Sequence, residues 1–370
     1  MIAALKQQFY ILLMKSRRLV IPALAAILML LVIVSTMQDL YTSLSKISDL
    51  ESFETEFASN QSDTEDILHS SLQPPPGRSI FFHETSCTYR NSRYYVMNLT
   101  ARQACSIESA ALNNPNLQIF TVFSCPTYRP LVGRQKLLVD AIESYENVNF
   151  RHLNLRDYAM STPIEDWVKR GELLNSSFPM EHTSDLLRLI SLYRFGGIYL
   201  DMDIIVLKSL EKLPLNYVGA ESNYSLCNAV IGLAADGIGH EVAELFLERY
   251  VKYFNGKDYA QNGPALVTAV LLKFCGTSLM KAIEGGRKSC KGFRLFNTTA
   301  FYSIPWQEWK HFTEPRYLEE TMARTKDSLM IHIWNIASRR ERIKVASNIA
   351  YVKYAEKYCP RTYAVAGDYL

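Results

Sequence analysis

Two aspartates separated by a single residue, Asp201 and Asp203, interrupt an otherwise apolar stretch of the chain. Residues 198–200 before them have the pattern of a short buried strand, and residues 204–207 continue the apolar run. A sheet interior cannot hold two unpaired carboxylates, so these side chains must meet a cation or solvent. Side chains alternate along an extended chain, which predicts that the two aspartates point one way and Met202 the other. Such a pair suits a hard divalent cation, Mg²⁺ or Mn²⁺, and a solvated strand end is the alternative interpretation.

A helix is predicted directly upstream, over residues 184–195. Apolar residues recur there at helical spacing behind a polar capping cluster at 183–185, and the glycines at 196–197 provide a left-handed stop. Asp185 and Arg188 are three residues apart and therefore share one helix face. An exposed ion pair of this kind contributes only about 0.3 to 0.5 kcal/mol and is the simplest explanation of the spacing.

Alternating strand and helix patterns predict an α/β fold with a doubly wound, mostly parallel sheet flanked by helices. In such a fold ligands bind at the carboxyl ends of the strands. The strands are expected at 80–83, 117–123 and 148–153, and the helices at 101–112 and 134–144. The sequence contains neither G-x-G-x-x-G nor G-x-x-x-x-G-K-[ST], so the usual carriers of dinucleotide and P-loop chemistry are missing. A net charge of +3 without a basic stripe gives nucleic-acid binding little support.

The N-terminal region has the pattern of a membrane anchor. Sixteen uncharged, mostly apolar residues at 19–34, extended to 37, would span about 28 Å as a helix. Basic residues precede this segment and acidic residues follow it, which predicts a cytosolic tail at 1–18, a transmembrane helix at 19–37 and type II topology. A cleaved signal peptide and a buried core helix are the alternatives.

The acidic, Ser/Thr-rich segment at 38–78 ends in three prolines and is interpreted as a stem, with a helical hairpin as the alternative. It leaves 79–370 as the expected lumenal domain. Two features of that domain fit an oxidising compartment. All seven cysteines follow the anchor, which allows up to three disulfides, and none has C-x-x-C zinc spacing. The five Asn-x-Ser/Thr sequons lie on the same side, at Asn60, Asn98, Asn175, Asn223 and Asn297.

The aspartate pair lies in one of several short segments that together form a recognisable pattern along the chain. The joined segments around the pair are S-D-L-L-R at 184–188 and F-G-G-I-Y-L-D-M-D at 195–203. The others are F-F-H-E-T-S at 81–86, A-C-S-I-E-S-A at 104–110, G-P at 263–264, F-Y-S-I-P-W-Q-E-W at 301–309 and H-I-W-N at 332–335. In order and rough spacing they closely resemble the family of α-1,4-galactosyltransferases and α-1,4-N-acetylglucosaminyltransferases, which are retaining DXD enzymes of the GT-A type. Met202 stands where that family more often has Thr.

The resemblance implies a role for individual residues. Asp201 and Asp203 would bind the metal, with His332 completing the shell, and an imidazole suits Mn²⁺ better than Mg²⁺. Asp185, Arg188, Tyr199 and Asp201 would bind the donor, while Asn228 and Gln261 would lie with the two aspartates near the reacting centre. Trp306 and Trp309 could pack against the acceptor's sugar rings, and a core position is the equal alternative for both.

The function implied is that of a Golgi hexosyltransferase that uses Mn²⁺ and UDP-Gal. It would make an α-1,4 linkage on a galactose- or GalNAc-ended glycolipid such as lactosylceramide. An α-1,4-N-acetylgalactosaminyl- or N-acetylglucosaminyltransferase acting on glycolipids or glycoproteins is the alternative, and a catalytically silent Golgi lectin or chaperone is a third. Whether the enzyme forms homo-oligomers, or hetero-oligomers with other Golgi transferases, is left open. Whether retention proceeds by front-side or double displacement is left open.

Overall fold

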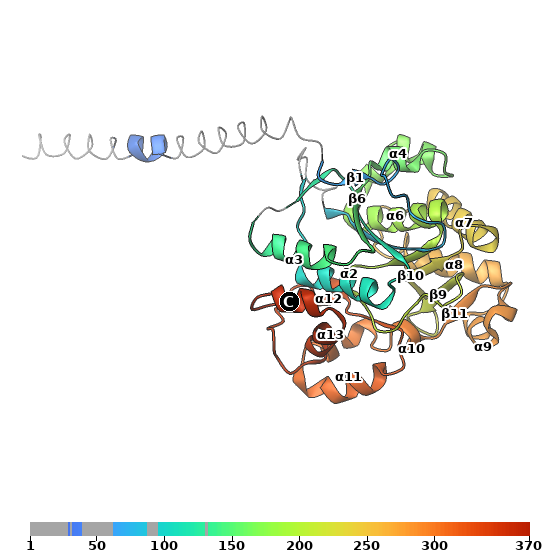
Figure 1. Cartoon of the computed structure of the whole chain (residues 1–370). Coiled ribbons are helices and arrows are strands. Elements are labelled where there is room, and N and C mark those ends of the chain that lie inside the picture. The colour runs from blue at the N-terminus through green and yellow to red at the C-terminus, as the bar shows by residue number, and fades with distance from the viewer. Residues whose placement is uncertain (1–28, 30–31, 39–61, 87–94, 130–131) are drawn as a thin grey trace, which may run out of the picture. The chain divides into compact units, whose positions relative to one another are not determined.

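The computed structural model describes residues 29, 32–38, 62–86, 95–129 and 132–370 (Figure 1). The chain divides into two units, Met1–Gln61 and Ser62–Leu370. In the first unit residues 32–38 are helical, and the hydroxyl of Thr36 donates to the carbonyls of Val32 and Ile33. The rest of the predicted anchor, the cytosolic tail and the stem up to Gln61 lie outside the described residues.

Among the described residues, no single helix is long and apolar enough to cross a bilayer. Two consecutive helices, Pro264–Cys275 and Leu279–Ser289, reach that length and apolarity only when taken together, and they are bent by 56°.

The second unit alternates strands and helices over most of its length. Its strands are β1 (Glu65–Asp66), β2 (Ser79–Glu84), β3 (Tyr95–Val96), β4 (Gln118–Phe123), β5 (Thr127–Tyr128), β6 (Val148–His152), β7 (Gly197–Leu200), β8 (Ile204–Val206), β9 (Tyr217–Ala220), β10 (Leu226–Leu233), β11 (Arg294–Phe296) and β12 (Met330–His332). Its α-helices are α2 (Ala101–Asn113), α3 (Gly133–Glu143), α4 (Leu155–Ala159), α5 (Glu165–Lys169), α6 (Pro179–Phe195), α7 (Gly237–Tyr253), α8 (Pro264–Cys275), α9 (Leu279–Ser289), α10 (Thr298–Phe301), α11 (Leu318–Thr325), α12 (Asn335–Ser338), α13 (Ala350–Tyr358) and α14 (Pro360–Val365).

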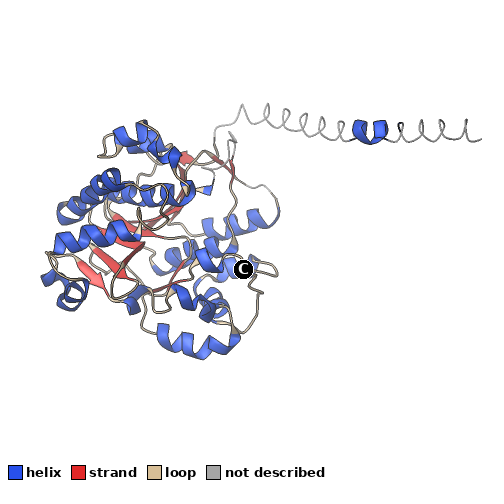
Figure 2. Cartoon of the chain, turned by 180° about the vertical axis from the view of Figure 1, so that it is seen from behind, coloured by secondary structure: helices blue, strands red, loops and turns tan. Residues whose placement is uncertain are grey.

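The central sheet is mostly parallel, as predicted. Its strand order is β1-β6-β4-β2-β7-β10-β9-β11, and the first five strands are parallel to one another. Strand β10 runs antiparallel to both β7 and β9, whereas β11 is again parallel to β9. Figure 2 shows the strands enclosed between helices.

Both faces of the sheet are buried because alternate side chains enter two different cores. In β2, Ile80 and Phe82 join the core that also contains residues of α2, α3 and α13. Phe81, between them, joins the core that contains residues of α6, α7 and α8. This two-sided burial explains why the strands read as continuous apolar runs rather than as alternating patterns.

The compact unit begins earlier than the sequence predicted. The stem was expected to extend to residue 78, but Ser62–Arg78 belongs to this unit. Strand β1 pairs in parallel with β6 at the edge of the sheet, and Ile67 is fully buried. A two-residue edge strand is too short to give a periodic signal, which explains why the acidic composition of the segment suggested a stem.

Helix α6 also begins earlier than the predicted residue 184. Its first residue is Pro179, which fits the first helical position because its ring presets the helical φ angle. The polar cluster at 183–185 does not cap the helix, since the Thr183 hydroxyl donates back to the carbonyl of Pro179. The predicted stop is confirmed, with φ of 62° at Gly196 and 90° at Gly197. A Cβ at Gly197 would lie 2.4 Å from the carbonyl oxygen of Ser79, so the close approach of β7 to β2 also requires glycine.

Disulfides link one distant and one nearby pair of segments in the unit. Cys105 in α2 is bonded to Cys359, Cys275 to Cys290, and Cys125 is also disulfide-bonded, while Cys227 is a buried free thiol. The structural role predicted for the cysteines therefore holds for the described residues. The sequon asparagines at 98, 175, 223 and 297 are all exposed, and Asn60 lies outside the described residues.

Candidate active site

The two aspartates of the D-x-D segment lie where the chain leaves the central sheet. Strand β7 ends at Leu200, and the chain turns so that the N–H of Ile204 donates to the carbonyl of Asp201 at 3.0 Å. Strand β8 then pairs with β12, outside the central sheet, in an antiparallel register that sets Ile204 opposite His332. This pairing brings His332 beside Asp203 across 129 residues of sequence.

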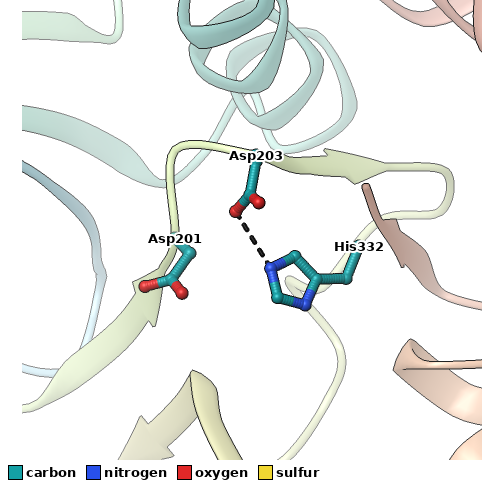
Figure 3. Close-up of side chains that lie close together, drawn as sticks. All are labelled: Asp201, Asp203 and His332. Carbon is teal, nitrogen blue, oxygen red and sulfur yellow. Dashed lines mark hydrogen bonds and ion pairs between the residues drawn. The ribbon is translucent and has the colours of Figure 1, made fainter. Parts of the chain in front are cut away.

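Asp201, Asp203 and His332 form a cluster that could hold a metal ion (Figure 3). One ligand atom from each lies within 4.8 Å of the others, and Nε2 of His332 is 3.0 Å from Oδ1 of Asp203. Asp203 and His332 are buried, and Asp201 is half-buried. Two carboxylates and one imidazole provide oxygen and nitrogen ligands that fit Mn²⁺ or a similar divalent ion. The residues therefore suit the metal that the sequence implies.

The local conformation differs from the predicted one. Residues 201–203 form a turn, not an extension of the strand, so the expected alternation of side chains does not apply. The aspartates converge because of the turn. Met202 is buried, and the side-chain amide Nε2 of Gln103 in α2 donates to its sulfur at 3.8 Å.

Hydrogen bonds orient Asp203 for this role. Its Oδ2 accepts the backbone N–H of Asn335 at 2.6 Å, and its Oδ1 faces His332. Burial by itself would raise the pKa of the Asp203 carboxyl, but His332 and the Asn335 N–H outweigh burial and hold that pKa below its ordinary value. Burial likewise opposes charge on His332, yet Asp203 raises the pKa of the imidazole. The carboxylate is therefore kept ionised, which is the form that binds a cation.

A second group of polar side chains joins α6 to the D-x-D turn. Arg188 donates through Nη1 to Oδ1 of Asp201 and to the carbonyl of Asn228, both at 2.9 Å. Its Nη2 is 3.2 Å from Oδ1 of Asp185, and Asp185 accepts from the Asn228 amide at 2.7 Å. The hydroxyl of Tyr199 donates to Oδ1 of Asp201 at 2.7 Å. The pair that the sequence presented as an exposed helical ion pair is instead a buried network.

Burial and neighbouring charges shift the pKa values of the groups in this network. Burial raises the pKa of the Asp185 carboxyl, and Arg188 and Asn228 offset only part of that increase. For Arg188, burial opposes the charge, but Asp201, Tyr199 and Asp185 outweigh it and raise its pKa. Arg188 is thus a permanent cation between two carboxylates.

Both groups of residues lie on the wall of one cavity of about 710 Å³. It is lined by His83, Glu84, Thr85, Gln103, Met180, Glu181, Ser184, Asp185, Arg188, Tyr199, Asp201, Met202, Asp203, Glu221, Cys227, Asn228, Tyr259, Ala260, Pro264, Trp306, His332, Trp334, Asn335, Ile336 and Ala337. In the part of the chain that the structure describes, Arg188 is the one arginine or lysine on this wall, against six carboxylates. A cavity with this excess of negative charge can accept an anionic ligand only together with an added cation.

Most, but not all, of the predicted site residues meet in this cavity. Gln261 does not line it; the buried amide of that segment is Asn262, which bonds His182 and Asn255. The two tryptophans lie in different environments. Trp306 lines the cavity, and Trp309 packs against the hydrophobic core. The geometry therefore gives no support to a catalytic role for Gln261 or an acceptor role for Trp309.

Several lining residues were not predicted. Glu84 and Asn335 belong to segments of the family resemblance, so their motifs could have identified them. Glu221 and Tyr259 lie in loops without a distinctive pattern, and nothing in the sequence marks them. His83 is buried, and burial together with Arg188 lowers its pKa to about 3, so the His83 imidazole is neutral.

Comparisons with known proteins identify glycosyltransferases as relatives of this chain. A family described as the alpha 1,4-glycosyltransferase conserved region matches residues 235–366, and one described as a glycosyltransferase sugar-binding region containing the DXD motif matches residues 100–224. Lactosylceramide 4-alpha-galactosyltransferase of Homo sapiens is 32% identical over 298 residues, covering 80% of this chain and 79% of that protein. The Rattus norvegicus enzyme of the same name is 30% identical over 80% of this chain and 77% of its own length. Alpha-1,4-N-acetylglucosaminyltransferase of Homo sapiens is 24% identical over 77% of this chain and 80% of its own.

Weaker likenesses connect the chain to solved structures. One is the galactosyltransferase LgtC in complex with donor and acceptor sugar analogs, 14% identical with a TM-score of 0.37, covering 77% of this chain and 95% of that one. Another is the PaToxG glycosyltransferase, 19% identical with a TM-score of 0.36, covering 54% and 70%.

The mostly parallel α/β sheet and the D-x-D cavity define a glycosyltransferase of the hexosyltransferase class, whose DXD region implies a divalent metal ion and a nucleotide-sugar donor. The chain belongs to the α-1,4-glycosyltransferase family that contains the lactosylceramide 4-alpha-galactosyltransferases.

Gly263 provides a test of how tightly the cavity wall is packed. A Cβ at this position would lie 2.7 Å from Nδ2 of Asn228 and 2.9 Å from Oδ1 of Asp185, closer than side chains approach. Gly263→Ala is expected to displace this pair and lower kcat/KM for the nucleotide sugar by about tenfold to a hundredfold, because small misplacements of a binding group are costly. Steady-state kinetics with the donor varied would measure it. An unchanged kcat/KM would mean that the Asp185–Asn228 pair has no part in donor binding.

Proposed function

We propose that this chain is a retaining α-1,4-galactosyltransferase that transfers galactose from UDP-Gal to a galactose- or GalNAc-ended glycolipid such as lactosylceramide. The observation that carries the proposal is the Asp201–Asp203–His332 cluster on the wall of the cavity, in a chain 32% identical to the human lactosylceramide enzyme. We further propose Mn²⁺ as the ion, with Mg²⁺ as the alternative.

Different residues of the cavity would bind different parts of the donor. Asp201, Asp203 and His332 would hold the ion, which when bound supplies a Lewis acid against the charge of the diphosphate. Arg188 would keep Asp201 in place through the 2.9 Å bond, with Tyr199 donating to the same oxygen. Asp185 and Asn228, bonded to each other at 2.7 Å, would present a carboxylate and an amide to hydroxyls of the donor sugar.

The acceptor would enter from the side of the cavity that Trp306 lines. An indole face is a flat apolar platform on which the C–H surface of a pyranose can pack. Front-side displacement needs no protein nucleophile, whereas double displacement would use a group such as the Asp185 carboxylate, so both routes stay open.

We place the enzyme in the Golgi membrane as a single-pass type II protein with its catalytic unit in the lumen. The apolar segment at 19–37 and its charge asymmetry support this topology. Four exposed sequon asparagines and the disulfides support exposure to an oxidising, glycosylating compartment.

The second candidate is α-1,4 transfer of an N-acetylhexosamine. It is favoured by the 24% identity to the human N-acetylglucosaminyltransferase over 77% of this chain. The two functions differ in whether the donor pocket admits an acetamido group, which is a question of pocket shape. A silent lectin is the weakest candidate, because a binder has no need for two carboxylates and an imidazole arranged around one point.

A donor panel tests the proposal. UDP-Gal, UDP-GalNAc and UDP-GlcNAc would each be supplied with lactosylceramide or a GalNAc-ended glycolipid, with Mn²⁺ or with a chelator, followed by linkage analysis. We expect UDP-Gal to give a terminal α-1,4-galactose on lactosylceramide, with loss of product on chelation. Preference for an N-acetylated donor would instead support the second candidate, α-1,4 transfer of an N-acetylhexosamine. Binding of UDP-Gal and Mn²⁺ without turnover on any acceptor would favour the silent binder.

A further inference from the structure

Two apolar side chains are exposed on the wall of the cavity. Trp306 is 49% exposed and Ile336 is 54% exposed. They come from neighbouring elements, the 3₁₀ helix Trp306–Phe312 and helix α12, which contact each other. Single exposed apolar residues are ordinary on protein surfaces, but two together beside a substrate cavity indicate a surface that something covers during function.

Basic side chains begin one helical turn beyond Ile336. Between residues 339 and 344 the exposed basic residues are Arg339, Arg340, Arg342 and Lys344, against one acid, Glu341. Arg339 continues the helical backbone of α12 and follows Ile336 by three residues, which places both on one face.

The basic surface continues onto helix α3. The guanidinium of Arg342 lies 4.0 Å from the ring centroid of Tyr369, and the guanidinium of Arg134 donates to the carbonyl of the same tyrosine. Arg134 is itself exposed. Two residues before it, Val132 is 79% exposed, so apolar and basic side chains are mixed here as they are at α12.

We propose that these residues form a membrane-docking surface that rests on the headgroups of an anionic lipid bilayer and opens the cavity toward an acceptor embedded there. The surface comprises Trp306, Ile336, Arg134, Arg339, Arg340 and Arg342. The inference rests on the proposed function, in which the acceptor is a glycolipid.

Charge and side-chain chemistry select a bilayer as the occupant. Lysine and arginine near a membrane surface with anionic headgroups each contribute about 1 kcal/mol of attraction, so the lumenal leaflet that the catalytic unit faces must carry such headgroups. Tryptophan is enriched at the membrane–water boundary, because its ring is apolar and its N–H is polar. The ceramide of a glycolipid stays in the bilayer and its sugars extend only a short distance from it, so the cavity must come to the membrane surface.

The test separates docking from catalysis by changing the acceptor. The full-length chain would be reconstituted into phosphatidylcholine vesicles with or without phosphatidylserine. Transfer would be measured both to lactosylceramide in those vesicles and to free lactose in solution. The variant is Arg339→Glu/Arg340→Glu. Its matched control is Lys281→Glu/Lys288→Glu, the same charge change at exposed positions of α9, which Figure 1 shows well apart from α12.

We expect the Arg339/Arg340 variant to transfer to lactosylceramide in anionic vesicles about tenfold more slowly than the wild type, with less than about a twofold change on lactose. The control should match the wild type on both acceptors. The wild-type advantage on anionic over neutral vesicles should shrink as salt is added, because salt screens exposed charges.

Three results would overturn the inference. The Arg339/Arg340 variant could transfer to lactosylceramide in anionic vesicles as fast as the wild type. Its rate on free lactose could fall by the same factor as its rate on vesicles. The Lys281/Lys288 control could show the same loss on vesicles. If the wild type transferred galactose to neither acceptor, the proposed function itself would fail, and docking for a glycolipid acceptor would fail with it.

Discussion

Replacing Asp203 with asparagine is expected to lower the rate of sugar transfer about a thousandfold. Asparagine has the same shape and can still accept the N–H of Asn335, which Asp203 binds at 2.6 Å, but it removes the negative charge facing His332. A metal that stabilises a leaving diphosphate contributes several kcal/mol, and about 4 kcal/mol corresponds to that factor in rate.

Two measurements would check this expectation independently. Single-turnover transfer with saturating UDP-Gal gives the rate, and calorimetric titration with Mn²⁺ gives the affinity, which should fall about a hundredfold because a charged ligand is lost. Asp166→Asn, at an exposed position of α5, is the matched control and should change neither quantity. If the Asp203 variant kept wild-type affinity for Mn²⁺, the cluster would not be the metal site, whatever happened to the rate.

Removing the charge of Arg188 should cost both stability and activity. Arg188→Met is expected to lower the free energy of unfolding by about 3 to 5 kcal/mol, because the buried Asp185 and the half-buried Asp201 would lose their shared cation. Activity should fall by at least about a hundredfold, since Asp201 would lose the bond that aims its carboxylate.

Urea unfolding would measure the stability change, and two further variants would identify its cause. Arg194→Met is the same substitution on the same helix, but Arg194 donates to the carbonyls of Tyr158 and Met160 and lies over the ring of Tyr158. Its cost should be about 1 kcal/mol per hydrogen bond, with about 0.5 to 1 kcal/mol more for the ring contact. Adding Asp185→Asn to Arg188→Met should recover part of the lost stability, because one of the two stranded carboxylates disappears. No recovery in the double variant would argue that packing, not charge, accounts for the effect.

The elements around the site could be predicted where the chain repeats a local pattern. Strands β2, β4, β6 and β7 and helices α2 and α3 were found within a few residues of their predicted bounds, since each carries its apolar periodicity or flanking glycines within its own length. Edge strand β1 and the first turn of α6 were missed. A two-residue strand has no period, and the side chain of Thr183, within the expected cap, bonds the helix that contains it.

The metal cluster shows a different limit. Spacing alone was compatible with a cation between Asp201 and Asp203 or with a solvated strand end, and nothing near His332 in the sequence connects it to them. Only the family resemblance suggested that connection, and the antiparallel register of β8 and β12 provides it physically. The same reasoning applies to the tryptophans at 306 and 309, which are equal candidates in sequence and lie on a cavity wall and against a core in the structure.

From the printed residues one could deduce the alternation of strands and helices, the carboxylate pair, the family and the anchor-like N-terminal segment, because each of these is encoded by neighbours along the chain. The folded unit alone settled that Arg188 is buried between two carboxylates, that His332 reaches Asp203, and that six carboxylates share one cavity with a single guanidinium among the described residues. Those relations depend on which strands pair and in which register, and sheet pairing between distant segments leaves no periodic trace in the sequence of either one.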